Sequence, residues 1–179
     1  MRPEDQRPGA PRYTVEARTL IFLTRGNRLL LLRGSPTKRL WAGKYNGIGG
    51  HLEPGESPIQ SARRELREEV GLTAPELALR ALVHVTLPEP PGVLLFVFAG
   101  EAGPGEPVPS EEGTPVWIPL DAGVEQAISA LPLVEDLPEL LPRVLEPVSR
   151  DSPPGEAAVN DLIYATYVVT EKGLQMTFA

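Results

Sequence analysis

The sequence contains no cysteine, which excludes disulfides, thiolate metal sites and a cysteine nucleophile. Carboxylates are therefore the available metal ligands. The sequence also lacks an apolar run long enough to cross a bilayer, and no internal repeat is evident. Its 179 residues fit one domain with a substantial core. We therefore expect a single soluble domain over residues 13–179.

Positive charge is scarce as well, and the formal net charge is −7. This balance argues against a nucleic-acid polymer as partner, because such proteins concentrate Lys and Arg on one face. A small phosphate substrate is still compatible with it, since bound cations can neutralise the phosphates. Residues 1–12 are polar and proline-bearing, without the apolar segment of a signal peptide. We expect a flexible tail there, cytoplasmic residence and no membrane partner.

The stretch 50–72 carries the strongest helix signals of the chain. Ser57 and Gln60 form a capping box, and Pro58 stands at the first helical position, where its missing N–H costs nothing. Gly71 is the expected stop, because a residue just past the last turn often adopts the left-handed conformation. The sequence predicts a helix of three to four turns that begins at Pro58.

The faces of this helix differ in chemistry. An apolar stripe is formed by Ile59, Ala62, Leu66 and Val70. One flank carries the carboxylates of Glu65, Glu68 and Glu69, and the other carries Arg63, Arg64 and Arg67. Clustered carboxylates repel one another unless something positive lies against them, and hard divalent cations prefer such oxygen ligands. An ordinary charged helix is the alternative explanation.

The spacing around this helix resembles the signature of the Nudix hydrolases. The matching positions are Gly50, Glu56, Arg64, Glu65, Leu66, Glu68, Glu69, Gly71 and Leu72. The resemblance implies a loop–helix–loop that binds Mg²⁺, with Mn²⁺ as a substitute, and hydrolyses a nucleoside diphosphate linked to another group. It also implies an α/β fold, a mixed sheet in an α/β/α sandwich.

The resemblance further implies roles for individual residues. The metal ligands would be Glu65, Glu68, Glu69, the carbonyl of Gly49 and, from outside the signature, Glu112. Glu68 is the leading candidate for the general base, with Glu65 next. Arg64 would orient Glu68 by a charge-assisted bond, while Gly50, Glu56 and Gly71 would have structural roles, Glu56 through its place near the helix start.

The segment 43–50 resembles the MutT-like subgroup, which acts on oxidised purine nucleoside triphosphates. An aromatic–Asn pair precedes the glycines in that subgroup, and the resemblance implies that Asn46 contacts the base; a simple turn residue is the alternative. The loop 33–45 is basic, and Arg33 and Lys44 are candidates for phosphate contacts or else belong to a solvated loop. The sequence departs from the subgroup at Leu133 and Val134, where an aromatic residue would be expected beside the acids Glu135 and Asp136. Purine specificity therefore stays open.

The rest of the chain predicts a mixed sheet with helices on both sides. Hairpins are expected from 15–23 with 28–32, from 79–86 with 93–99, and from 162–169 with 174–178, together with a strand over 115–119 and helices over 121–129 and 133–145. Pro138 and Pro142 should bend or interrupt the last helix. Trp117 lies in an apolar strand and is expected in the core.

Three functions fit these sequence features. The first is a magnesium-dependent pyrophosphatase that converts a nucleoside triphosphate, with oxidised purines as one option, to the monophosphate and pyrophosphate. The second has the same chemistry on ADP-ribose, another dinucleotide or a nucleotide sugar. The third is a module that senses a nucleotide without cleaving it, which is disfavoured because every carboxylate of the signature is present.

Overall fold

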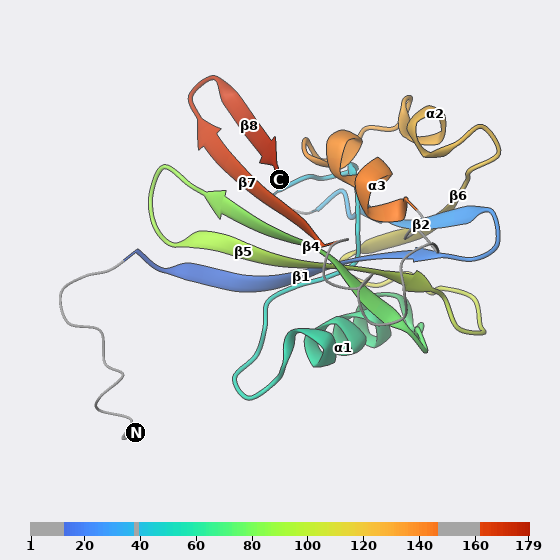
Figure 1. The fold of residues 1–179 in the computed structure, drawn as a ribbon. Helices are drawn as coiled ribbons and strands as arrows, with labels where there is room; N and C mark the ends of the chain where they lie inside the picture. Colours follow the sequence, from blue (N-terminus) through green and yellow to red (C-terminus); the bar gives the residue numbers. More distant parts are fainter. Residues whose placement is uncertain (1–12, 38–39, 147–161) are drawn as a thin grey trace, which may run out of the picture.

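One mixed sheet runs through the molecule, and helices cover both of its faces (Figure 1). The computed structural model describes residues 13–37, 40–146 and 162–179, so the predicted tail over 1–12 lies outside the described residues. From one edge to the other, the strands are β3 (Tyr45–Asn46), β2 (Arg28–Gly34), β1 (Val15–Thr24), β5 (Gly92–Glu101), β4 (Leu77–Thr86), β7 (Ile163–Thr170) and β8 (Gly173–Phe178), and β6 (Gly113–Pro119) also pairs with β2.

The three predicted hairpins are confirmed, since β1–β2, β4–β5 and β7–β8 pair in antiparallel fashion. Two parallel pairs, β1–β5 and β4–β7, connect these hairpins. The short strand β3 was not expected, because the sequence predicted a loop over 33–45; Arg33 instead belongs to β2 and Tyr45 to β3. A strand of two residues has too little pattern to be predicted from sequence.

The ladder between β1 and β2 is short, and the segment 47–51, which precedes the predicted helix, pairs with β1 beyond its end. The register of the β1–β2 ladder covers only Leu23–Leu30 and Thr24–Leu29. Beyond that point the segment 47–51 lies against β1, through isolated bridges from Ile48 to Ile21 and from His51 to Arg18. The glycines that precede the helix are therefore fixed to the centre of the sheet.

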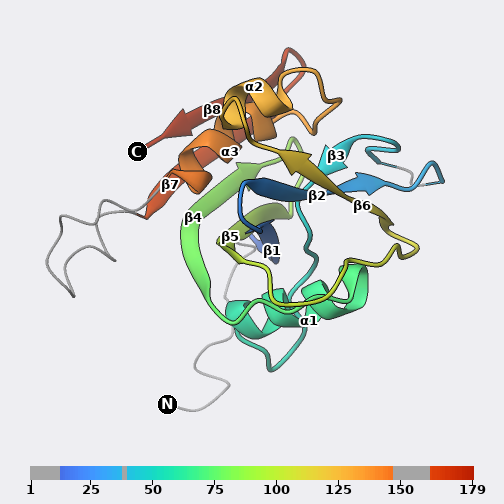
Figure 2. The ribbon, with the colours of Figure 1, turned by 90° about the vertical axis from the view of Figure 1, so that its right-hand side faces the viewer.

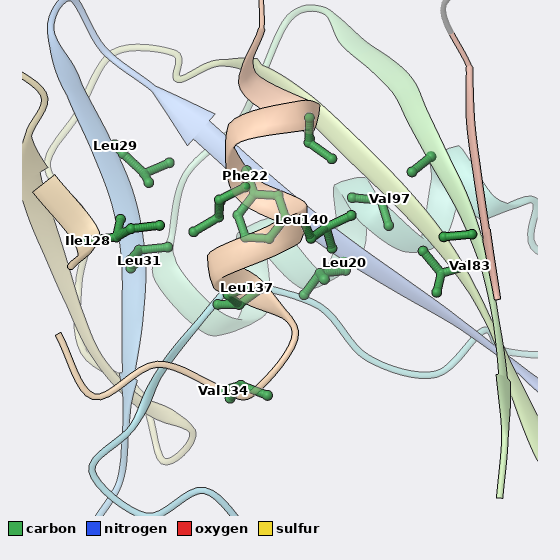
Figure 3. Close-up of a cluster of buried hydrophobic side chains, with 14 of the residues drawn as sticks. Leu20, Phe22, Leu29, Leu31, Val83, Val97, Ile128, Val134, Leu137 and Leu140 are labelled. Carbon is green, nitrogen blue, oxygen red and sulfur yellow. The ribbon is translucent and has the colours of Figure 1, made fainter. Parts of the chain in front are cut away.

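The two faces of the sheet carry two hydrophobic clusters, because neighbouring strand residues point to opposite sides. On β1, Ile21 faces the cluster under helix α1 (Pro58–Val70), whereas Phe22 faces the cluster under α3 (Leu137–Leu145). Figure 2 shows α1 on the opposite side of the sheet from α3 and the short helix α2 (Val124–Ile128). In Figure 3, Leu137 and Leu140 of α3 lie over Leu20 and Phe22. The predicted α/β/α arrangement is confirmed.

Helix α1 begins and ends where the sequence predicted. The Ser57 amide donates to Gln60 Oε1 at 2.8 Å, which is one half of the capping box. At the other end Gly71 has φ 68°, the left-handed conformation that glycine adopts without strain. Both signals come from residues of the segment itself, so the positions of the helix ends do not depend on tertiary packing.

The helices on the other face are shorter than predicted. The helix expected over 133–145 begins only at Leu137, with Pro138 in its first turn and Pro142 inside it. The prediction was wrong at its start because Leu133 pairs with Tyr45 of β3. The helix expected over 121–129 is confined to Val124–Ile128. In the part of the chain that the structure describes, no helix has the length and hydrophobicity needed to span a membrane.

Candidate active site

The two glycines before the helix permit a close approach between the signature loop and β1. The Thr19 amide donates to the Gly50 carbonyl at 2.8 Å. A Cβ at Gly49 would lie 2.1 Å from the Thr19 carbonyl oxygen, and a Cβ at Gly50 would lie 2.4 Å from Glu65 Oε1. Any larger residue at position 50 would therefore displace the carboxylate of Glu65.

Two carboxylates of the helix lie on its inner side. Glu65 and Glu69 are 9% and 7% exposed, so they are buried next to the apolar stripe rather than on a solvated flank. Glu69 Oε2 accepts a hydrogen bond of 3.2 Å from the Gly49 amide. Buried carboxylates are costly unless they are paired, and they are uncommon without a functional reason.

Arg64 lies at the centre of the carboxylates rather than on an opposite flank. It donates to Glu65 Oε1 at 2.7 Å and to Glu68 Oε2 at 3.0 Å. The other end of its guanidinium donates to both oxygens of Glu56, at 2.8 and 3.2 Å. The separation of charges predicted from the helical projection was thus wrong at Arg64, because a long side chain can turn back over its own helix.

The Arg64–Glu56 pair fixes the loop to the helix. Arg64 also donates to the His51 carbonyl at 3.0 Å, and it lowers the pKa of Glu56 to about 2. Glu56 in turn accepts from the Glu53 amide at 2.7 Å. The sequence predicted the contact of Arg64 with Glu68 but missed its bond to Glu56, for which only the helix dipole had been considered.

The donor set around the helix suits a hard divalent cation. Glu65, Glu68 and Glu69 offer carboxylate oxygens, and the Gly49–Gly50 segment lies against two of them. Glu68 is the accessible member, with a side chain 60% exposed. Among the described residues, no group of three or more acidic or histidine side chains is arranged to hold a metal. Arg64 bonds two of these carboxylates, Glu65 and Glu68. Glu112 is exposed in the turn before β6 and accepts from the Ser35 amide through its carbonyl.

A second part of the site lies on the α3 side of the sheet. The Tyr45 amide donates to the Pro132 carbonyl at 2.8 Å, and the Val134 amide donates to the Tyr45 carbonyl at 3.1 Å. Leu133 pairs with Tyr45 in parallel. The segment 132–134 therefore continues the sheet beside β3, next to the basic loop, and a turn at 135–136 follows it.

The predicted substrate residues differ in their surroundings. Lys44 forms an ion pair with Glu135, the main cause that holds the pKa of this carboxylate below its usual range. Arg33 is exposed, with its guanidinium carbon 6.0 Å from the centre of the Tyr45 ring. Asn46 Oδ1 accepts from the Gly47 amide at 2.8 Å, which is the contact of a turn residue. The Lys44–Glu135 pair was not predicted, since 91 residues separate its members.

Asp136 is half-buried behind this pair. Desolvation raises its pKa to about 6, and the neighbouring charge of Glu135 adds to the shift. The buried Tyr167 lies close enough for the charge of Asp136 to contribute to its raised pKa, although desolvation is the main cause. The pKa values of these two neighbouring carboxyls thus shift in opposite directions, downward at Glu135 and upward to about 6 at Asp136.

Comparison with protein families gives a match to the NUDIX domain over residues 14–144. The chain belongs to the NUDIX domain family. The match covers both parts of the site, from the start of β1 to the end of α3. The expectation of a Nudix hydrolase is confirmed.

Curated relatives carry more than one kind of name. The chain is 34% identical over 110 residues to an "Oxidized purine nucleoside triphosphate hydrolase" of Danio rerio, covering 61% of this chain and 69% of the relative. The protein of the same name in Mus musculus is 33% identical over 104 residues, covering 58% of this chain and 65% of the relative. A "NAD-capped RNA hydrolase NudC" of Stutzerimonas stutzeri is 40% identical over 95 residues, or 52% of this chain, but this segment is only 32% of that protein.

Solved structures agree on the fold. The MutT protein of Bacillus halodurans superposes with a TM-score of 0.71 at 21% identity, covering 92% of this chain and 97% of that one. The MutT protein of Methanosarcina mazei Go1 superposes with a TM-score of 0.62 at 25% identity, covering 75% of this chain and 96% of that one. The Nudix fold predicted from the signature is therefore confirmed.

Proposed function

We propose that this Nudix hydrolase cleaves a phosphoanhydride bond of a nucleoside triphosphate and releases the nucleoside monophosphate and pyrophosphate. The observation that carries the proposal is the set of carboxylates around Arg64, packed against the two glycines that hold it to β1. The relatives named for oxidised purine nucleoside triphosphates favour this substrate class.

The same carboxylates are the proposed holders of Mg²⁺ or Mn²⁺. They are Glu65, Glu68 and Glu69, with the Gly49 carbonyl and Glu112 as further ligands. When bound, the metal supplies charge neutralisation of the phosphates and lowers the pKa of coordinated water. The chain itself contributes the orientation of these ligands, because Arg64 and Gly49 each hold a carboxylate in place.

Glu68 is the proposed general base, and Glu65 is the second candidate. Glu68 is exposed to incoming substrate, while its bond to Arg64 limits its rotation. In the reaction the water oxygen forms a bond to phosphorus, the bond between phosphorus and the bridging oxygen breaks, and the proton of the water passes to the carboxylate. The departing group keeps the bridging oxygen, and the products are the monophosphate and pyrophosphate.

The α3 side is the proposed binding region for the nucleoside. Asn46 would contact the base, and Arg33 and Lys44 are the proposed phosphate contacts. Lys44 would have to exchange its partner Glu135 for substrate, so it is the weaker of the two. Residues 13–179 are proposed to act as one domain, and cytoplasmic residence remains a prediction from composition.

Product identification tests the proposal. The purified protein is incubated with Mg²⁺ and a panel of ordinary and oxidised nucleoside triphosphates, and the products are separated by anion exchange. We expect monophosphate and pyrophosphate in equal amounts, and no products when EDTA is present. Release of inorganic phosphate alone would contradict the reaction, and failure to cleave any triphosphate would contradict the substrate class.

A dinucleotide is the second candidate substrate, because some relatives are named for hydrolysis of NAD-capped RNA. The bond cleaved would again be a phosphoanhydride, and the same carboxylates would serve. NAD and ADP-ribose belong in the same panel. A kcat/KM for either that exceeds the values for all triphosphates would favour this candidate.

A further inference from the structure

Trp41 is an unusual residue for its position in the loop between β2 and β3. Its φ is 58°, and it is the one described residue other than glycine with a positive φ. A tryptophan is disfavoured in this left-handed region, where a Cβ crowds the backbone. Its side chain is nevertheless 44% exposed, so burial of the indole does not compensate for the strain.

Hydrogen bonds fix the backbone around Trp41. The Lys44 amide donates to the Trp41 carbonyl at 3.0 Å, which closes a turn. The Gly34 amide donates to the Lys44 carbonyl at 2.9 Å, and the Gly43 amide donates to the Gly34 carbonyl at 3.1 Å. A Cβ at Gly34 would lie 2.8 Å from the Trp41 carbonyl oxygen. The position of Trp41 is therefore defined by the base of the loop.

This loop places the indole at the second part of the site. The turn that joins Trp41 to Lys44 brings the residue beside the Lys44–Glu135 ion pair. Lys44 is the main cause that lowers the pKa of Glu135, and the Trp41 side chain is a lesser one. Tyr45, four residues further along, is joined to Leu133 through the backbone. Within the described chain, Trp41 makes no ring–ring or cation–π contact with another residue. The indole is thus partly exposed, and no ring or cation of the described residues is stacked on it.

The residues that pair with Tyr45 on the neighbouring segment are aliphatic. Leu133 is half-buried and Val134 is buried, and neither can offer a flat ring to a nucleobase. Phe and Tyr side chains elsewhere on this face belong to the core cluster or pack against it, as Phe22 and Tyr45 do. Among the described residues of this loop, Trp41 is consequently the exposed aromatic side chain, and its backbone bond to Lys44 places it near the partner of Glu135.

We propose that Trp41 is a specificity-determining residue whose indole stacks on the base of the bound nucleotide, at the edge formed by Lys44, Leu133 and Glu135. The inference rests on the proposed function, since it assumes that a nucleobase occupies the α3 side of the site. Stacking tolerates many bases because each has a π-face, and it is stronger for the larger purines.

Steady-state kinetics with three substitutions of Trp41 test the stacking. Trp41→Ala should raise KM for purine nucleoside triphosphates about tenfold with kcat nearly unchanged, and Trp41→Phe should recover most of the loss. Trp41→Gly fits the left-handed backbone better than alanine. A KM as high in Trp41→Gly as in Trp41→Ala therefore points to the lost ring, whereas recovery in Trp41→Gly would point to loop shape and overturn the proposal.

The neighbouring Leu40 offers a matched control, because its side chain is 65% exposed in the same loop. Leu40→Ala should leave KM unchanged. An equal rise of KM in Leu40→Ala, or an unchanged KM in Trp41→Ala, would overturn the assignment of Trp41.

Fluorescence separates this inference from the proposed reaction. The chain has two tryptophans, so the Trp117→Phe variant leaves Trp41 as its single reporter. Titration of this variant with a purine nucleoside triphosphate in EDTA, with binding followed in parallel by calorimetry, should quench the emission. Quenching without hydrolysis in the magnesium assay would contradict the proposed reaction alone. Hydrolysis or binding without any change in emission would contradict the stacking alone. Absence of both binding and hydrolysis would contradict both.

Discussion

The two parts of the site are built in different ways. On the α1 side, Arg64 contacts Glu56, Glu65 and Glu68, all of which lie within eight residues of it in the sequence. On the α3 side, Lys44 contacts Glu135 across 91 residues. The proposed chemistry therefore depends on local spacing, whereas the proposed recognition of the nucleoside depends on how distant segments meet.

This difference suggests how each part can change. A helix with its own caps keeps its carboxylates in register whatever packs elsewhere. The α3 side combines a loop turn with an extended segment, so a new residue at Trp41 or Leu133 alters the proposed nucleoside region without altering the helix. Substitutions on the α1 side should thus affect kcat, and substitutions on the α3 side should affect KM or pH dependence.

Glu69→Gln should have the largest effect and would test whether the α1 side carries the chemistry. Glutamine can still accept the bond from the Gly49 amide, so the fold should persist while a ligand charge is lost. We expect turnover to fall on the order of 10²-fold or more, with little change in melting temperature. Glu125→Gln, an exposed carboxylate on α2, is the control. Near-wild-type turnover in Glu69→Gln would contradict the assignment.

Gly50→Ala should come next, and it tests the fit between the loop and the helix. The added Cβ would lie 2.4 Å from Glu65 Oε1, which forces this carboxylate to move. We expect turnover to fall by about 10- to 100-fold, because small displacements of reacting groups are costly. Gly26→Ala serves as the control: its φ of 55° strains an alanine, but no atom lies within 4 Å. That variant should lose stability and keep its turnover.

Arg64→Lys should have a smaller effect. Lysine retains the charge but cannot bond two carboxylates and the His51 carbonyl in the fork geometry of arginine. Turnover should fall about tenfold, with kcat rather than KM affected. Arg67→Lys, an exposed arginine of the same helix, should behave as wild type. Equal kinetics in both variants would remove Arg64 from its positioning role.

Asp136→Asn should have the smallest effect, and it concerns stability on the α3 side. Because the pKa of Asp136 is raised from 3.8 to about 6, ionisation opposes folding. The contribution of the protonated Asp136 carboxyl to the free energy of unfolding is fully present below about pH 4 and is lost as the pH rises through about 6. Asparagine cannot ionise, so the variant should be more stable than wild type at pH 8 by on the order of 1 kcal/mol. Urea unfolding at pH 4 and pH 8 measures this, and an equal difference at both values would contradict the raised pKa.

The sequence alone determined most of the α1 side. The capping box, the stop at Gly71 and the spacing of Arg64 and the three glutamates lie within one segment, so helix α1 and the family could be predicted from them. The hairpins were predicted for the same reason, since their strands are neighbours in the sequence. The contact of Arg64 with Glu56 was missed because a helical projection places side chains but ignores the length and flexibility of arginine.

Only the tertiary structure decided the α3 side. Leu133 has the periodicity of a helix, yet it extends beside β3 because the edge of β3 offers backbone hydrogen bonds that a helix start there would leave unmade. The pairing of Lys44 with Glu135 follows from this meeting of two segments far apart in the chain. Local propensity fixes a capped helix, whereas contacts over a long sequence separation depend on how the whole chain packs.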